Sequence, residues 1–268
     1  MNRRDLMLTA GVALWSGQGD AKTAGAADLL ADRVLTHVRM RAHPDGRPCH
    51  TWYRGTFYGQ RSGMRTQALL FIEGASTSTT ERQPDGSWKY RMREAGWFCD
   101  LHTHQVVNEW HNPLNDRVVK PAHYNSKQQL TFAPDGRVTP LTATPPPGLE
   151  WQGTLSEPTI AGNDVWSAEE LLVRVPPPPA GGSARVQTSL ATLHSDLRDL
   201  QKPQRAWVPA TLAYQTLGSW QPWLEMGDAT GVVTWRLAGR KCATLPEIPD
   251  SIFERIQREH PEVFQSVA

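Results

Sequence analysis

Apolar and polar residues alternate along much of the chain between residues 50 and 132. An alternation with a period of two is typical of strands that bury one face. Each alternating stretch is short and ends at turn-forming residues, and this spacing predicts an antiparallel meander. The predicted strands are residues 51–59, 67–73, 88–99, 105–111, 118–124 and 128–132.

The tripeptide Pro-Asp-Gly occurs at residues 44–46, 84–86 and 134–136. Proline presets φ at the second position of a turn, aspartate hydrogen-bonds locally, and glycine accepts the left-handed conformation. Because each copy lies beside strand-like segments, we predict a hairpin loop at each position. Residues 100–104 and 112–116 are predicted turns for the same reasons.

The second half of the chain begins with a different pattern. Two proline-rich stretches, residues 142–149 and 175–182, favour extended surface connections. Between them, Ser167-Ala168-Glu169-Glu170 has the spacing of a capping box and predicts the start of a short helix. Residues 185–200 are predicted as a further helical stretch, although Thr and Ser dilute its pattern.

Strands resume at residues 207–217 and 232–238, and a C-terminal helix is predicted from Asp250, as its N-cap, to His260-Pro261. No strand-helix-strand alternation is present. The sequence therefore predicts a mainly β fold, an antiparallel meander closing into a lipocalin-like barrel with a few helices. Residues 27–268 form one domain, with a proline-rich excursion around residues 142–185.

The first 26 residues have the features of an export signal. Arg3-Arg4 precede a short apolar segment, residues 6–15, and the small residues Ala24-Gly25-Ala26 resemble a cleavage site. The paired arginines indicate the twin-arginine route. We expect residues 1–26 to be a signal peptide, cleaved near Ala26, and the mature protein to be periplasmic.

Charge and motifs exclude several classes of function. Lys+Arg number 28 against Asp+Glu 27, a net charge of +1, so no basic surface for nucleic acid or an anionic membrane is indicated. No apolar run approaches the roughly 20 residues of a spanning helix. The motifs of serine hydrolases, nucleotide-binding proteins and zinc proteases are missing. We expect no cofactor and no nucleic-acid partner, and the sequence leaves the oligomeric state open.

The cysteines and the first histidines argue against a metal site. Cys49, Cys99 and Cys242 are far apart and form no redox or zinc motif. Either Cys49 pairs with Cys99, or all three are buried thiols that pack as small apolar groups, which we favour. His102 and His104 would share one strand face with Asp100, but a turn there would direct them into solvent, so we expect no metal.

Polar side chains on the predicted strands have the chemistry of an acid–base site. His111 and His123 lie on neighbouring predicted strands, and either one is a candidate general base, the alternative being a structural or surface histidine. Glu109 is expected to orient or replace that base, Tyr58 to donate a proton, and Arg54 to stabilise a developing anion. We predict these five residues to be catalytic.

The two faces of the strand at residues 51–59 bear on this prediction. Arg54 and Tyr58 share one face, whereas Tyr53 and Phe57 lie on the other. If Arg54 is buried it needs a carboxylate partner, for which Glu94 and Glu109 are candidates. Whether Arg54 points inward or into water stays open. Further tyrosines, including Tyr53 and Tyr124, are potential proton donors.

The chain holds 11 Trp against 5 Tyr and 6 Phe, and its most unusual segment is residues 219–227, Ser-Trp-Gln-Pro-Trp-Leu-Glu-Met-Gly. The internal proline excludes a regular central strand. This loop either plugs one end of the barrel or forms the wall of a pocket for an apolar ligand. The predicted substrate-binding residues are Trp52, Tyr90, Trp110, Trp220, Trp223 and Met226.

Four segments carry a resemblance to a known family. Residues 53–59, 110–113, 219–227 and 239–241 resemble the domain of unknown function 1838 family, in order, over the chain from about Arg39 to Pro261. Members often carry twin-arginine leaders. The family typically has a Thr-Gly turn after Asp100, whereas this chain has Thr103-His104. The resemblance implies no activity, so no catalytic role transfers from it.

We therefore expect an exported β-barrel protein that encloses an apolar, aromatic small molecule. The leading hypothesis is cofactor-free acid–base chemistry of the lyase or isomerase type. The alternative is a periplasmic carrier that uses the same cavity without chemistry, and a third is an envelope interaction module with exposed tryptophans. The substrate is not determined by the sequence.

Overall fold

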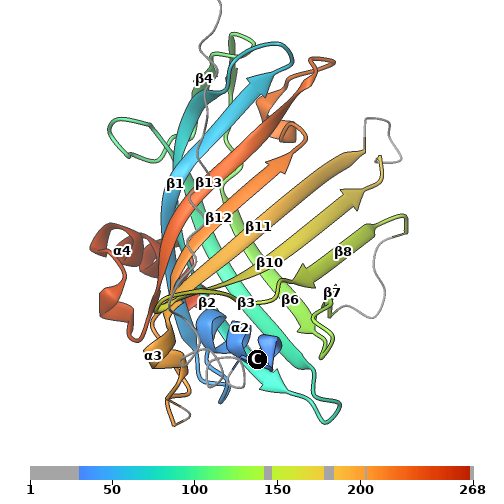
Figure 1. The fold of residues 1–268 in the computed structure, drawn as a ribbon. Helices are drawn as coiled ribbons and strands as arrows, with labels where there is room; N and C mark the ends of the chain where they lie inside the picture. The colour runs from blue at the N-terminus through green and yellow to red at the C-terminus, as the bar shows by residue number, and fades with distance from the viewer. Residues whose placement is uncertain (1–29, 142–146, 178–183, 203, 266–268) are drawn as a thin grey trace, which may run out of the picture.

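The computed structural model describes residues 30–141, 147–177, 184–202 and 204–265 (Figure 1). The predicted signal peptide and parts of both proline-rich stretches lie outside these residues. An antiparallel sheet, curled around a central space, forms most of the described chain. No helix in the described ranges is long and apolar enough to cross a membrane.

The large sheet consists of β1 (Cys49–Arg61), β2 (Gln67–Arg82), β3 (Trp88–Cys99), β6 (Tyr124–Phe132), β7 (Val138–Pro140), β8 (Glu150–Leu155), β9 (Thr159–Ala161), β10 (Asp164–Val175), β11 (Arg185–Asp196), β12 (Thr211–Gly218) and β13 (Gly231–Cys242). A separate hairpin is formed by β4 (Trp110–Asn112) and β5 (Arg117–Val119). The helices are α2 (Arg33–Arg41), α3 (Leu197–Leu200) and α4 (Asp250–Glu259), with 3-10 turns η1 (Pro222–Leu224), η2 (Leu245–Glu247) and η3 (Pro261–Phe264).

The sheet is nearly closed into a barrel. Its strand order is β7-β6-β3-β2-β1-β13-β12-β11-β10-β8, with β9 paired to β10. The strands at the two ends of this order, β7 and β8, meet at one point. There Arg137 forms a β-bridge to Thr154, and the amide of Leu155 donates to the carbonyl of Gly136 at 2.8 Å. The predicted mainly β fold, with its antiparallel meander, barrel-like closure and C-terminal helix, is confirmed.

Strand alternation decides which side chains are enclosed. Paired residues of neighbouring strands lie on the same face of the sheet. Once the inward residues of one strand are known, the register therefore identifies the inward residues of every other strand. Tyr53 and Phe57 of β1 are buried, whereas Trp52 and Arg54 lie on the outer face. The corresponding inward residues of β3 include Phe98 and the other even-numbered positions down to Trp88.

Two segments close the ends of the barrel. At one end, α2 packs against Trp88, Phe132 and other inward residues of β3 and β6. Its contacts are made by Val34, Val38 and the C-cap residue Ala42. At the other end, residues 219–227 pack on Phe57 and Phe98, with Leu224 fully buried. The side chains of Asn112 and Asn115 hold this loop by donating to the carbonyl of Leu224, each at 2.9 Å. The tryptophan-rich loop is therefore a barrel plug.

Helix α4 covers the outside of the sheet. Ile252 and Ile256 of α4 are fully buried against Ala75 of β2 and Ala95 of β3. Small residues at these positions let the helix approach the sheet closely. His260 ends α4, as expected, but the N-cap is Pro249 and Asp250 is the first helical residue.

Two predicted helices are strands. Residues 167–170 belong to β10, and residues 185–196 form β11, leaving only Leu197–Leu200 helical. β10 and β11 pair with each other over their full lengths, and β8, β9 and β12 pair with much of their outer edges, so most backbone groups of this stretch find partners in the sheet. That long-range pairing outweighs the local capping pattern. Within residues 142–185, predicted as an excursion, the described residues 150–175 supply β8, β9 and β10 to the sheet.

Other local predictions are corrected by the topology. The loops at residues 84–86 and 134–136 are hairpins with Gly86 and Gly136 at φ 84° and 81°, but residues 44–46 connect α2 to β1. Residues 105–111 form no continuous strand, because only Val106 bridges to the sheet and β4 begins at Trp110. Cys49, Cys99 and Cys242 are all buried free thiols, so Cys49 and Cys99 do not pair.

Candidate functional site

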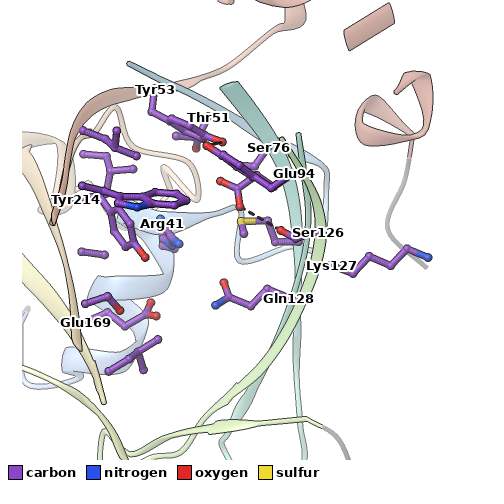
Figure 2. A pocket seen from close by; sticks show the side chains of 18 residues that line it. Arg41, Thr51, Tyr53, Ser76, Glu94, Ser126, Lys127, Gln128, Glu169 and Tyr214 are labelled. Atoms are coloured by element: carbon purple, nitrogen blue, oxygen red, sulfur yellow. Dashed lines mark hydrogen bonds between the residues drawn. The ribbon is translucent and has the colours of Figure 1, made fainter. Parts of the chain in front are cut away.

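A cavity of about 330 Å3 lies between the two plugs (Figure 2). This volume is at the lower end of the roughly 300–1,000 Å3 range of small-molecule pockets. Its lining combines apolar side chains with ionisable and hydroxyl groups from eight strands and α2. Its lining residues include Arg41, Tyr53, Ser76, Met92, Glu94, Tyr124, Ser126, Glu169, Ser189, Leu212, Tyr214, Trp235 and Leu237.

Two tyrosines meet across a pair of glycines. The register places Tyr53, Gly74, Gly96 and Tyr124 in one row across β1, β2, β3 and β6. With no side chain on either glycine, the two tyrosines lie over the sheet and the hydroxyl of Tyr124 donates to that of Tyr53 at 2.8 Å. Burial and the nearby carboxyl group of Glu94 raise the pKa of both phenols well above the usual value. Both hydroxyls are therefore neutral donors at physiological pH.

Glu94 is the acidic group of the cavity wall. It lies one inward position below this row, between Ser76 and Ser126. Burial raises its pKa, against the hydrogen bonds from Tyr53 and Ser126 and the charge of Arg41. Ser126 Oγ donates to Glu94 Oε2 at 3.3 Å. A carboxyl group held in place with a raised pKa is a stronger proton acceptor than an ordinary carboxylate.

Tyr214 supplies a hydroxyl on the wall formed by β12. Burial and the charge of Glu94 raise its pKa to about 12, while a hydrogen bond from Ser189 acts in the opposite direction. Because this pKa is high, the hydroxyl of Tyr214 keeps its proton at physiological pH and can donate a hydrogen bond to a ligand. Figure 2 shows Tyr214 and Glu94 on opposite sides of the cavity in this view.

The α2 plug brings a cation and a histidine to the lower end of the cavity. His37, fully buried, contacts Ser167 Oγ at 2.9 Å through Nδ1, and its Nε2 lies 3.6 Å from Glu169 Oε2. Burial lowers the pKa of His37, although Glu169 opposes this effect. Burial disfavours the charge of Glu169, but His37 and Arg41 outweigh it and lower the pKa of that carboxyl. The lower end thus holds a carboxylate and the guanidinium of Arg41.

A glycine substitution tests the tyrosine row. A Cβ at residue 96 would lie 2.3 Å from Cζ and from the hydroxyl oxygen of Tyr124. We expect Gly96→Ala to lower the free energy of unfolding by about 1–3 kcal/mol, as overpacking does, in urea denaturation. The same substitution should cost clearly less in a Tyr124→Ala background, since all three nearest atoms belong to that side chain. If Gly96→Ala lowers the free energy of unfolding equally in both backgrounds, the strain does not arise from contact with Tyr124.

The raised pKa of Glu94 predicts a pH effect on stability. Folding favours the protonated carboxyl, so this contribution is complete below the ordinary pKa of 4.5 and is lost as pH rises through the higher folded-state value. The Tm of Glu94→Gln minus that of the unaltered protein should therefore increase from pH 4 towards pH 8. Glu81→Gln, at an exposed carboxylate, is the control and should show no such increase. A flat difference for Glu94→Gln contradicts the assignment.

None of the five residues predicted as catalytic lines the cavity. His111 is 60% exposed and pairs with Asp116, and Glu109 is 67% exposed beside Lys120. Tyr58 lies on the outer face beneath Arg236, because strand alternation places it opposite Phe57.

Arg54 and His123 lie at the outer face near α4. Arg54 Nε contacts Glu73 Oε2 at 3.1 Å, so its carboxylate partner is neither Glu94 nor Glu109. His123 Nδ1 accepts from the amide of Phe98 at 3.2 Å, and the residue borders a groove beside α4. His111 and His123 therefore do not face one cavity.

The residues predicted to bind substrate are also placed around the cavity rather than on its wall. Trp52 packs under α4 on the outer face. Tyr90 is buried against the α2 plug and donates to Met92 Sδ at 3.2 Å. The other four, Trp110, Trp220, Trp223 and Met226, belong to the tryptophan-rich end, where Trp223 lies 5.0 Å from Phe98 between ring centroids.

Sequence reasoning missed Arg41, Glu169 and Tyr214. Arg41 lies on α2, which the sequence signals through Asp32, whose carboxylate caps the helix, and the apolar pair Val34 and Val38. Glu169 was assigned to a helix, which hid its inward position on β10. In the part of the chain that the structure describes, no three His, Cys, Asp or Glu side chains group as metal ligands.

Comparison with family descriptions places most of the chain in a known family. The description of a protein of unknown function, DUF1838, matches residues 46–144 and 185–267, more than half of the chain. The matched residues contain the tyrosine row and Glu94, but Arg41 and Glu169 lie outside them.

Comparisons with individual proteins are less informative. The curated proteins contain no match. Among solved structures, MucB in complex with MucA(peri) is 11% identical, over 87% of this chain and 97% of that chain, with a TM-score of 0.12. The MucA/MucB complex of Pseudomonas aeruginosa is 12% identical over the same shares, with a TM-score of 0.13. At these TM-scores neither likeness supports an argument about this protein.

Proposed function

This chain belongs to the DUF1838 family of proteins of unknown function, and we propose that its barrel binds a small molecule and catalyses cofactor-free proton transfer. The reaction type is an isomerisation or an elimination. The site is the cavity lined by Glu94, Tyr214 and Arg41.

One observation carries the proposal: Glu94, with a raised pKa, faces the cavity between the two plugs and is held by Tyr53 and Ser126. A partly buried carboxyl group without an ion-pair partner is costly to keep ionised. Such groups are concentrated at sites of acid–base chemistry, where the pKa must lie near the working pH.

The surrounding groups suggest how the step proceeds. The carboxylate of Glu94 removes a proton from a carbon next to a substrate carbonyl, the C–H electron pair forms a C=C bond, and charge moves onto the carbonyl oxygen. Tyr214 donates a hydrogen bond to that oxygen. Return of the proton from Glu94 to another carbon completes an isomerisation, and loss of a leaving group from the adjacent carbon completes an elimination.

We further propose that the protein acts outside the cytoplasm. The basis is the leader pattern of residues 1–26, with Arg3-Arg4 before an apolar segment. Expression with and without Lys substitutions at both arginines, followed by fractionation, tests this assignment. Loss of the periplasmic species in the Lys variant is expected, and an unchanged distribution contradicts the twin-arginine route.

Proton exchange separates an enzyme from a carrier. 2-Tetralone is an aromatic ketone with acidic protons next to its carbonyl, and its small size suits the cavity. We expect the mature protein to accelerate deuterium incorporation at these positions in D2O, followed by NMR, above the rate in buffer. If 2-tetralone binds, as seen by quenching of Trp fluorescence, but exchanges at the buffer rate, the protein is a carrier and the catalytic proposal is wrong.

A further inference from the structure

Arg41 is the cavity residue that the proton-transfer step leaves without a role. It lies in the last turn of α2 and lines the cavity with Glu94 and Glu169. Figure 2 shows it between Tyr214 and Glu94 in that view. A guanidinium group stays charged at every physiological pH and carries five N–H donors.

The donors of Arg41 have no acceptor among the described residues. Its guanidinium lies over the ring of Tyr90, 5.5 Å from Cζ to the ring centroid, and its Nε is buried without a hydrogen-bond partner. The neighbouring Arg39, by contrast, donates to the carbonyl groups of Leu200, Asp199, Lys202 and Arg205. An enclosed guanidinium that lacks acceptors is costly unless a ligand or water supplies them.

Glu169 does not accept a hydrogen bond from Arg41. Its Oε2 faces His37 at 3.6 Å, and no hydrogen bond joins it to Arg41. Its charge acts on Arg41 only through space. The fork of guanidinium donors therefore remains available to a planar acceptor within the cavity.

We infer that the substrate is a small monocarboxylate whose carboxylate binds Arg41 while its apolar, aromatic body contacts Trp235, Leu212 and Leu237. This inference rests on the cavity being the binding site proposed above. A carboxylate matches the planar fork of a guanidinium in a bidentate pair. Lys127 also borders the cavity, but its side chain points away from it in Figure 2, so Arg41 is the cation that faces the ligand. One inward cation beside the acidic groups Glu94 and Glu169 favours a monoanion over a doubly charged phosphate.

The arrangement along β3 places the two ends of such a ligand. Arg41 lies over the ring of Tyr90, and both Tyr90 and Glu94 face inward from β3. The charges of Arg41 and Glu94 act on each other across the cavity. Trp235 lies farther up, 5.5 Å from Tyr124 between ring centroids. A carboxylate at Arg41 thus leaves the middle of the ligand next to Glu94 and its apolar end against Trp235.

Two isosteric probes test the inference. 2-Naphthoate and 2-naphthamide have the same shape and differ in charge, and their dissociation constants are measured by calorimetry and Trp fluorescence. We expect 2-naphthoate to bind at least about tenfold more tightly, the size expected for hydrogen bonds to a charged group. Arg41→Met should remove this preference by weakening 2-naphthoate alone. Arg236→Met, on the outer face, is the matched control and should retain it.

The outcomes are separable from those of the proposed function. Equal affinity for the two probes, binding of neither, or a preference that survives Arg41→Met overturns the inference, even if 2-tetralone exchange is accelerated. A carboxylate preference without exchange leaves the inference intact and makes the protein a carboxylate carrier. If Arg41→Met does not fold, the preference of the unaltered protein and its decrease with salt decide the question.

Discussion

Glu94→Gln should reduce the protein-catalysed exchange of 2-tetralone protons by about 10²- to 10⁴-fold, the range that a positioned general base contributes. The amide preserves the size of the side chain and an acceptor for Ser126 and Tyr53, but it cannot take a proton from carbon. Because the pKa of the carboxyl is raised, glutamine also resembles the form that folding favours. We therefore expect loss of exchange without loss of Tm at neutral pH. The exchange rate is measured by NMR in D2O.

Two variants make this result specific. Glu81→Gln changes an exposed carboxylate on the neighbouring β2 strand and should leave exchange unchanged. His111→Ala tests the base predicted from the sequence alone against Glu94, the base assigned from the cavity. His111 lies in the β4–β5 hairpin, away from the cavity, and its side chain is 60% exposed. Full exchange in Glu94→Gln, or its loss in His111→Ala, would refute the role given to Glu94.

The largest effect on stability is expected at Glu73, on the outer face under α4. Glu73 is 3% exposed, and its two oxygens contact Arg54 Nε at 3.1 Å and Arg255 Nη1 at 2.9 Å. Glu73→Ala leaves two guanidinium groups facing each other without an anion. Removing one partner of a buried ion pair costs about 3–5 kcal/mol; since Arg54 is partly exposed, we expect about 3 kcal/mol in urea unfolding.

A matched surface pair provides the control. Glu81 and Arg91 lie 3.2 Å apart on the same two strands, β2 and β3, but Glu81 is 54% exposed. Exposed pairs contribute at most about 1 kcal/mol, so Glu81→Ala should have little effect. Removing Arg255 together with Glu73 should recover part of the loss, because one uncompensated charge disappears. Similar losses for Glu73→Ala and Glu81→Ala would show that burial does not decide the effect.

The role of Arg54 illustrates a limit of local pattern. The alternation of β1 correctly separates Arg54 and Tyr58 from Tyr53 and Phe57. It does not state which set is enclosed, because both contain aromatic residues. α4, almost 200 residues away in the chain, covers part of the outer face and buries Glu73 there, which makes that face resemble an interior. The residues predicted as catalytic on this strand, Arg54 and Tyr58, lie on the outer face and do not line the cavity.

The sequence by itself determined the turns at Gly86 and Gly136, the full extent of β3, the C-terminal helix and the antiparallel order of the first strands. These features depend on neighbouring residues, through φ preferences, capping and a period of two. The sequence also identified the tryptophan-rich loop as an irregular apolar segment.

Only the tertiary structure decided where the chemistry lies. Tyr53 meets Tyr124 because four strands align in register, and Arg41 reaches the cavity because α2 enters one end of the barrel. Glu169 becomes an inward residue because β10 pairs with β11 rather than coiling into a helix. Each event depends on contacts between distant segments, whose energy is absent from any local pattern and is gained only when the sheet curls and both of its faces are covered.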